Sequence, residues 1–278
     1  MQNDLIVVIG AGGIGQAIAR RQGSGRSVLL ADLNEQTLDV AATAMRGTGH
    51  TATTHRVDVS SRESVHALAS AAAEQGNVFQ VVHTAGLSPV QASPSAILAV
   101  DLLGVALVLE EFGRVIAHGG AGLVISSMAG HMLPPLDPSQ ERALAHTPAD
   151  QLLGLPFLSA DAVPNSGAAY ALSKRANNLR VQAESVVWGD RGARVNSMSP
   201  GIILTPLAQQ EMASQGGPMY RSMIDTSAAG RVGTTDEIAA AAAFLLGPDA
   251  TFITGSDLLI DGGVIAAIRT GRLELPSG

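Results

Sequence analysis

A tyrosine and a lysine four positions apart, Tyr170 and Lys174, are the residues of this sequence best suited to acid–base chemistry. Residues i and i+4 of a helix share one face, with Cβ atoms about 5 to 6 Å apart. An ammonium beside a phenol favours the phenolate and lowers its pKa from the usual value of about 10. Lys174 is the single lysine among 17 Lys and Arg residues, and Tyr170 is one of two tyrosines. The pair predicts a tyrosine that accepts and donates a proton.

Two serines strengthen this chemical interpretation. A Tyr and a Lys one helical turn apart could equally be a half-buried aromatic and a surface cation. Ser126 and Ser127, however, end an apolar run within 121–130. A hydroxyl there can hydrogen-bond the oxygen of a carbonyl or alcohol substrate. Ser127 lies further beyond the predicted strand and is the preferred candidate, with Ser126 as the alternative.

A glycine-rich turn near the N-terminus predicts a dinucleotide-binding site. Gly10, Gly12 and Gly15 have G-x-G-x-x-G spacing, directly after the apolar run 5–9 and before a helix-like segment. Glycines permit the tight turn and let the backbone approach a pyrophosphate, whose charge the helix N-terminus stabilises. Gly13 lies in the same turn and belongs to the predicted site. The pattern could be an ordinary turn, but its place between strand and helix favours the site.

An aspartate at the end of the second apolar run predicts which dinucleotide is bound. Asp32 lies about 20 residues after Gly10, where the dinucleotide fold places an acid on the adenosine ribose. A carboxylate there repels a 2′-phosphate, and the following LNEQ sequence contains no cation, so NAD is expected in preference to NADP. Asp32 could instead cap the next helix.

Short β-rich runs alternate with longer helix-like segments along the chain. Such alternation, with strands of continuous Val, Ile and Leu character, predicts a parallel sheet covered by helices on both faces. We therefore expect one α/β domain over 1–278, a Rossmann-like doubly wound sheet of about seven strands. The strands are expected within 5–9, 27–32, 53–59, 79–86, 121–130, 193–201 and 256–263, and the helices within 35–46, 61–75, 95–118, 168–188 and 235–247.

Small and polar residues lie at the ends of two further predicted strands. Asp58 and Val59 end the third apolar run, and Ala85 and Gly86 end the fourth in the sequence HTAG. In a doubly wound sheet the ligand lies across the carboxyl ends of the strands. Each residue could be only part of a turn, but their repetition at successive strand ends favours contacts with the adenine and ribose.

One segment, 131–167, interrupts the alternation just before Tyr170. It is proline-rich, and a connection of this length inside a compact domain is uncommon. We expect a flap with one or two short helices, either a wall of the substrate pocket or a surface element. Its apolar sequences MLPPL and LLGLPFL favour a hydrophobic substrate, although they could also pack against the protein or a partner subunit. Residues 268–278 are expected to form a tail or an arm to a neighbouring subunit.

Charge and composition argue against several classes of protein. The net charge is −7, and no Lys/Arg run exceeds the Arg20-Arg21 pair, so nucleic-acid phosphates find no basic surface. The absence of cysteine excludes disulfides and Cys-ligated metals, and the seven histidines lack ligand spacing, so no metal is expected. No apolar run is long enough to span a membrane. We expect a cytoplasmic protein that binds neither nucleic acid nor membrane.

Taken in order along nearly the whole chain, these motifs resemble the short-chain dehydrogenase/reductase family. The resemblance implies a single Rossmann-like domain, often a tetramer, that transfers a hydride between a nicotinamide and a carbonyl or alcohol carbon. The motifs that carry it are the glycine-rich turn, Asp32, VDV at 57–59, HTAG, VISSMAG, YALSK, SPGIILT at 199–205, GRVG at 230–233 and FITGSDLLIDGG at 252–263.

The resemblance also implies roles for individual residues. Tyr170 acts as acid and base, Lys174 lowers its pKa and holds the nicotinamide ribose, and Ser127 orients the substrate oxygen. The implied cofactor contacts are Ile14 at the pyrophosphate, Asp32 and Leu33 at the adenosine ribose, Asp58 and Val59 at the adenine, Ala85 and Gly86 in the cleft, and Ile203 and Thr205 at the carboxamide or nearby phosphate.

Three features depart from the family pattern. The first turn is one residue shorter than T-G-x-x-x-G-x-G, with Ile9 in place of the threonine. Asp101 stands where the family has an asparagine that supports a proton-relay water, and its charge could raise the pKa of Tyr170. The interval between Ser127 and Tyr170 is longer than usual, and the excess is the segment 131–167.

The sequence thus predicts an NAD-dependent oxidoreductase for a secondary alcohol or ketone that is hydrophobic or cyclic, such as a steroid or terpenoid. The alternative within the enzyme class is a 3-oxoacyl reductase, which Asp32 and the lack of a basic surface disfavour. The alternative that is not an enzyme is a non-catalytic NAD-binding sensor, which the presence of Ser127, Tyr170 and Lys174 disfavours. We expect a homo-oligomer, a tetramer or a dimer.

Overall fold

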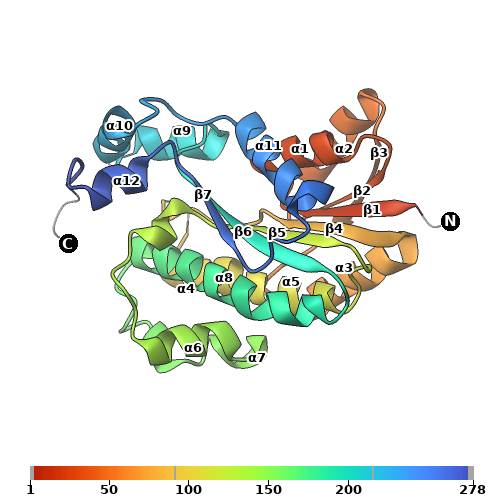
Figure 1. Cartoon of the computed structure of the whole chain (residues 1–278), viewed down its shortest axis with the longest axis horizontal. Coiled ribbons are helices and arrows are strands. Elements are labelled where there is room, and N and C mark those ends of the chain that lie inside the picture. The colour runs from red at the N-terminus through yellow and green to blue at the C-terminus, as the bar shows by residue number, and fades with distance from the viewer. Residues whose placement is uncertain (1–2, 91, 215, 275–278) are drawn as a thin grey trace.

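The protein is built around a seven-stranded sheet in which every strand runs parallel to its neighbours (Figure 1). The computed structural model describes residues 3–90, 92–214 and 216–274. The strand order is β3-β2-β1-β4-β5-β6-β7, so the direction of winding reverses between β1 and β4. The strands are β1 Asp4–Ile9, β2 Ser27–Asp32, β3 Thr51–Arg56, β4 Asn77–His83, β5 Ala121–Ile125, β6 Arg194–Pro200 and β7 Asp257–Ile260.

Helices cover both faces of this sheet. Helices α1, α2 and α11 lie on one face, and α3, α5 and α8 lie on the other, above and below the sheet in Figure 1. The predicted fold class, a doubly wound parallel sheet, is confirmed. The helices are α1 Gly13–Gln22, α2 Glu35–Gly47, α3 Arg62–Gln75, α4 Pro94–Ile97, α5 Gly104–Gly113, α6 Pro138–His146, α7 Ala149–Leu152, α8 Ser166–Gly189, α9 Pro206–Ala213, α10 Gly217–Thr226, α11 Thr235–Leu246 and α12 Val264–Arg269.

The central strand β1 shows why these strands are continuous apolar runs. Leu5, Val7 and Ile9 pack into the cluster beneath α3, α5 and α8. Ile6 and Val8 pack into the cluster beneath α1, α2 and α11. All five side chains are fully buried, because β1 lies in the middle of a parallel sheet that helices cover on both faces.

The helix expected within 95–118 is present and contains an irregular turn. After α4, a π-helical turn extends over Leu98–Leu103 before α5 begins, and the helix ends at Gly113. Asp101 lies in the π-helical turn and is fully buried. Such turns change which side chains face a given neighbour and are frequent at functional sites. The predicted helix is present, and the π-helical turn within it was not predicted, because the apolar pattern does not reveal the extra residue in one turn.

The insertion 131–167 packs on the outer side of α8. It contains α6 and α7, which lie together at the bottom of Figure 1. Leu144, Leu152, Leu158 and Val163 are buried in the same core cluster as α5 and α8. The predicted short helices are present, and they cover a helix face of the domain.

Polar contacts also tie the insertion to the domain. The Arg180 Nη1 atom donates to the carbonyl oxygens of Leu144 and Thr147, at 3.0 and 2.9 Å. The Arg180 Nη2 atom lies 3.5 Å from the carboxylate of Glu110, which also accepts from the Ala149 N–H at 2.9 Å. A buried guanidinium is stable only with hydrogen-bonding and charged partners. The insertion therefore supplies acceptors for Arg180, whose charge would otherwise be poorly paired.

The prediction that this segment forms a wall of the substrate pocket is wrong for its central residues. Only Met132, near its start, and Gly167, at its end, line the cavity described below. Its apolar side chains pack against the protein, which is the alternative that the sequence left open. They therefore carry no information about the substrate.

Replacement of Leu144 by alanine should destabilise the domain without changing which substrates it prefers. The side chain is fully buried, and such a truncation costs about 2 to 5 kcal/mol of unfolding free energy. Denaturant unfolding measures the loss. Leu153→Ala is the matched control in the same segment, because Leu153 is 38% exposed. A Leu144→Ala protein of unchanged stability with altered substrate preference would contradict this assignment.

A third apolar cluster lies beyond the carboxyl ends of the strands, where α9, α10 and α12 gather (Figure 1). It contains Met128, Ile202 and Met223, and Leu273 is buried in it. The part of the predicted tail up to residue 274 therefore packs against the domain, and 275–278 lie outside the described residues. Among the described helices, none has the length and apolar character needed to cross a membrane.

Candidate active site

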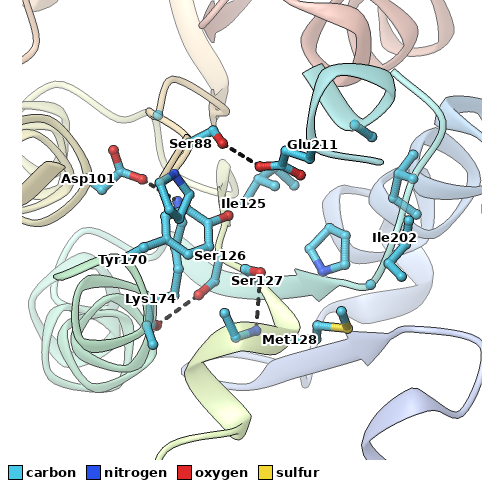
Figure 2. A pocket seen from close by; sticks show the side chains of 18 of the residues that line it. Ser88, Asp101, Ile125, Ser126, Ser127, Met128, Tyr170, Lys174, Ile202 and Glu211 are labelled. Atoms are coloured by element: carbon cyan, nitrogen blue, oxygen red, sulfur yellow. Dashed lines mark hydrogen bonds and ion pairs between the residues drawn. The ribbon is translucent and has the colours of Figure 1, made fainter. Parts of the chain in front are cut away.

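Tyr170 and Lys174 lie on one face of α8, as their spacing predicts (Figure 2). Asn165 caps this helix by accepting a hydrogen bond from the Ala168 N–H at 2.9 Å. The Lys174 Nζ atom lies 5.1 Å from the centre of the Tyr170 ring. Burial raises the pKa of Tyr170 above its usual value, whereas Lys174 and a side-chain hydrogen bond with Ser127 oppose this rise. The three predicted residues thus meet at the end of β5.

The two serines after β5 have different surroundings. The Ser126 hydroxyl is buried and donates to the Lys174 carbonyl oxygen at 2.8 Å, which ties β5 to α8. The Ser127 hydroxyl accepts from the Ala129 N–H at 3.2 Å and keeps donor capacity toward the cavity. The preference for Ser127 over Ser126 is consistent with this geometry.

The glycine-rich turn after β1 is tightly packed on one side and open on the other. Gly10 has a φ of +99°, which favours glycine, and Thr84 Oγ1 donates to its carbonyl oxygen at 2.8 Å. A Cβ on Gly15 would lie 2.0 Å from the same oxygen. A Cβ on Gly12, by contrast, would have no atom within 4 Å. The open side lies at the start of α1, where unpaired N–H groups favour a phosphate.

The carboxylate of Asp32 links the glycine-rich turn to the turn that follows β2. Its Oδ2 atom accepts from the Ala11 N–H at 2.7 Å, and its Oδ1 atom accepts from the Asn34 N–H at 2.9 Å. A carboxylate has about four lone-pair positions, so two remain for ribose hydroxyls. The alternative that Asp32 caps the next helix is not what the structure shows, because Asn34 is the cap. The residues present thus fit an adenosine ribose at this point.

The remaining adenosine-side candidates lie at the same sheet edge. The Val57 N–H donates to the Asp32 carbonyl oxygen at 2.9 Å, so the ends of β2 and β3 meet just before Asp58 and Val59. Leu33 is 54% exposed, as expected of a side chain at an open edge. These residues lie outside the cavity that contains Tyr170.

A cavity of about 420 Å³ lies between the end of β5, α8 and α9. Besides Ser127, Tyr170 and Lys174, it is lined by the predicted cofactor residues Ile14, Gly86, Ile203 and Thr205. Gly13 adjoins it, since a Cβ there would lie 3.4 Å from Thr205, and Ala85 packs against the core behind it. Its apolar lining includes Ile125, Met128, Met132, Ile202 and Met223.

Comparison with known proteins decides the family. The family model described as enoyl-(acyl carrier protein) reductase matches residues 9–137 and 140–265. A short-chain dehydrogenase/reductase of Alternaria brassicicola, bsc3, is 43% identical over 96% of this chain and 97% of its own. This chain belongs to the short-chain dehydrogenase/reductase family.

Two further proteins are similar to this chain at lower sequence identity. D-threitol dehydrogenase of Mycolicibacterium smegmatis is 29% identical to this chain, and the match covers 93% of this chain and 91% of D-threitol dehydrogenase. A short-chain dehydrogenase/reductase from Serratia marcescens BCRC 10948 superposes with a TM-score of 0.74 at 24% identity, over 95% of this chain and 98% of its own. At that identity the superposition supports the fold alone.

Asp101 gives this member of the short-chain dehydrogenase/reductase family a buried ion pair. Its Oδ2 atom lies 3.0 Å from Lys174 Nζ, and its Oδ1 atom accepts from the Leu87 N–H at 2.7 Å. Burial alone would lower the pKa of Lys174, but Asp101 and Tyr170 raise it above its usual value. Burial raises the pKa of Tyr170; Lys174 lowers it, and Asp101 raises it again. Asp101 therefore offsets part of the effect of Lys174 on the phenol.

Replacement of Asp101 by asparagine should shift the pH dependence of alcohol oxidation to lower pH. The aspartate charge raises the pKa of Tyr170, so its removal lets the phenolate form at lower pH. Oxidation requires the phenolate, and its rate rises as pH passes through this pKa. The profile of kcat/KM against pH tests the shift. An unmoved profile, or one moved to higher pH, would contradict the assigned effect of Asp101.

Sequence reasoning missed three residues of this site. Thr84 closes the glycine-rich turn, and Ser88 and Glu211 line the cavity. Glu211 had a detectable signal, because it is the only acidic residue in the segment TPLAQQEMASQGGPMYRSM at 205–223. Thr84 lies within the HTAG motif, which marks this strand end, whereas Ser88 had no signal, since hydroxyls are common in loops after strands.

Proposed function

We propose that this member of the family is an NAD-dependent oxidoreductase that transfers a hydride between nicotinamide and a secondary alcohol or ketone. The observation that supports the proposal most directly is the meeting of Ser127, Tyr170 and Lys174 at one cavity. The glycine-rich turn lies at the same edge of the sheet. A non-catalytic NAD-binding sensor has no need of this acid–base arrangement.

Each residue has a role in the proposed reaction. Ser127 donates a hydrogen bond to the substrate oxygen and stabilises the charge that develops on it. Tyr170 accepts the hydroxyl proton during oxidation and returns it during reduction. Lys174 stabilises the phenolate and remains charged because Asp101 is its partner. The bound nicotinamide supplies the hydride acceptor or donor.

The preference for NAD over NADP rests on Asp32. Its carboxylate is held at the end of β2 by two backbone N–H groups and retains acceptor capacity for ribose hydroxyls. A 2′-phosphate at that place would bring two negative charges together, and like charges in contact cost several kcal/mol. The proposal is therefore a cofactor with an unphosphorylated ribose.

The substrate is proposed to have an apolar ring or chain. This rests on the methionine and isoleucine side chains of the cavity, since the insertion does not cover it. Methionine side chains adapt to irregular apolar shapes. The related D-threitol dehydrogenase is named for a polyol, which also favours an alcohol as the reacting group.

Purified protein should form reduced nicotinamide from NAD⁺ and a secondary alcohol. The substrates to compare are cyclohexanol, a hydroxysteroid and threitol, with reduction of an acetoacetyl thioester as the acyl alternative. We expect kcat/KM with NADP⁺ to be about 100-fold lower, as a few kcal/mol of repulsion requires. Asp32→Ser should narrow this difference, and Asp39→Ser, on the exposed face of α2, should leave it unchanged.

Three outcomes contradict the proposal. Tight NAD⁺ binding without turnover of any substrate in either direction would favour the sensor. Equal use of NADP⁺ by the natural protein would refute the role assigned to Asp32. Turnover of the acetoacetyl thioester alone would favour the 3-oxoacyl reductase.

A further inference from the structure

The carboxylate of Glu211 projects from α9 into the cavity on the side opposite the end of β5 (Figure 2). Its Oε1 atom accepts a hydrogen bond from the hydroxyl of Ser88, in the loop after β4. Its Oε2 atom accepts from the hydroxyl of Tyr220, in α10, at 3.1 Å. Ser88 is 1% exposed, so a buried hydroxyl fixes the direction of the carboxylate. Three separate segments thus hold Glu211 in one orientation.

The charge of Glu211 has no cationic partner among the described residues, whose ion pairs all involve other carboxylates. Each of its oxygens uses one of about two lone-pair positions, so acceptor capacity remains on both. Burial raises the pKa of Tyr220, and Glu211 raises it further. Glu211 also contributes to the raised pKa of Tyr170, so its field reaches the proposed acid–base group.

The surroundings of this carboxylate define the chemistry of a complementary ligand. The cavity is otherwise lined largely by apolar side chains, including Met128, Ile202 and Met223. In such surroundings an ionised acceptor favours a hydroxyl or ammonium donor and disfavours an anion. A hydrogen bond to a charged group strengthens binding by about 10- to 100-fold.

We propose that Glu211 is a specificity-determining residue that binds a hydroxyl or ammonium group of the substrate, away from the reacting carbon, and excludes substrates with a carboxylate there. This inference deepens the proposed function and depends on it for the reacting group. The expected substrate is an apolar ring or chain with a second, hydrogen-bond-donating group. A purely structural role, in which Glu211 only links α9 to the loop containing Ser88, makes a different prediction.

The test uses cyclohexanol and its derivatives with a hydroxyl, ammonium or carboxylate group at C2, C3 or C4. Their kcat/KM values are measured with NAD⁺, and their binding to the protein–NADH complex is measured by calorimetry. The natural protein is compared with Glu211→Gln, which keeps the shape but removes the charge. Glu74→Gln is the matched control, because Glu74 is an exposed residue of α3, outside the cavity.

In the natural protein and in Glu74→Gln, we expect the kcat/KM and the affinity of the best ammonium or hydroxyl derivative to exceed those of cyclohexanol by about 10- to 100-fold. The values for the carboxylate derivatives should fall below those of cyclohexanol. Glu211→Gln should lower the ratio of ammonium to carboxylate binding by at least about 10-fold. A uniform change for all probes would show a structural role only and overturn the proposal. The proposal would also be overturned if the natural protein bound all the probes equally well, or bound none of them.

The two measurements separate this inference from the proposed function. One possible result is that binding depends on the charge of the second group, that Glu211→Gln removes this dependence, and that neither the natural protein nor any variant shows turnover. This result would support the subsite and contradict the oxidoreductase assignment. If the protein oxidises cyclohexanol and its derivatives with the same kcat/KM whatever the second group, the result supports the oxidoreductase assignment and contradicts the subsite.

Discussion

Replacement of Tyr170 by phenylalanine is expected to lower kcat about 1,000-fold while leaving the affinity for NADH almost unchanged. Acid–base catalysis by a positioned side chain contributes roughly 10² to 10⁴-fold, and phenylalanine keeps the ring but cannot transfer the proton. The ring packs against the core beside α8, so its retention preserves the fold. Steady-state turnover and fluorescence titration with NADH measure the two effects separately.

The other tyrosine of the chain provides the comparison. Tyr220 also lines the cavity, but its hydroxyl donates to Glu211. Tyr220→Phe should therefore cause a much smaller loss of kcat than Tyr170→Phe. A Tyr170→Phe protein that keeps more than about a tenth of the natural kcat would remove Tyr170 from the proposed mechanism.

Replacement of Gly15 by alanine is expected to weaken the binding of NAD⁺ strongly and to destabilise the protein. The added Cβ would lie 2.0 Å from the Gly10 carbonyl oxygen and 2.8 Å from Thr84 Oγ1, so the turn must open. Overpacking of this kind costs about 1 to 3 kcal/mol. Loss of the backbone N–H contacts to the pyrophosphate should weaken binding about 100-fold or more. Calorimetric titration with NAD⁺ and denaturant unfolding test both parts.

Gly12→Ala separates cofactor contact from folding. A Cβ at Gly12 would meet no protein atom within 4 Å, so the stability of the cofactor-free protein should be nearly unchanged. The same methyl group would project into the open side of the turn and weaken NAD⁺ binding. If Gly15→Ala proved as stable as Gly12→Ala, the tight packing of the turn would be contradicted.

Most of the fold was predictable because its signals are local. The runs 5–9 and 27–32 correspond closely to β1 and β2, since strands buried on both faces are continuously apolar. The helix containing Tyr170 was predicted over 168–188 and extends over Ser166–Gly189, with an asparagine cap at its start. The π-helical turn at Leu98–Leu103 was not predictable, because its composition is that of an ordinary buried helix.

The candidate site was predictable where spacing along one element determines the geometry. The positions of Tyr170 and Lys174 on one helical face follow from helical periodicity. The ion pair between Asp101 and Lys174 does not, because it joins two helical elements whose packing decides which atoms meet. The charge of Asp101 was recognised as a departure from the family pattern, but its partner was not.

The parallel sheet, the glycine-rich turn and the order of residues suited to proton and hydride transfer can all be inferred from the amino-acid sequence. These depend on backbone preferences and on spacing within single elements. The packing of the insertion on α8, the pairing of Asp101 with Lys174 and the entry of Glu211 into the cavity beside Ser88 became visible only in the folded molecule. Those contacts join residues far apart in the chain, and they are set by how the packed layers bring side chains together, which no local pattern encodes.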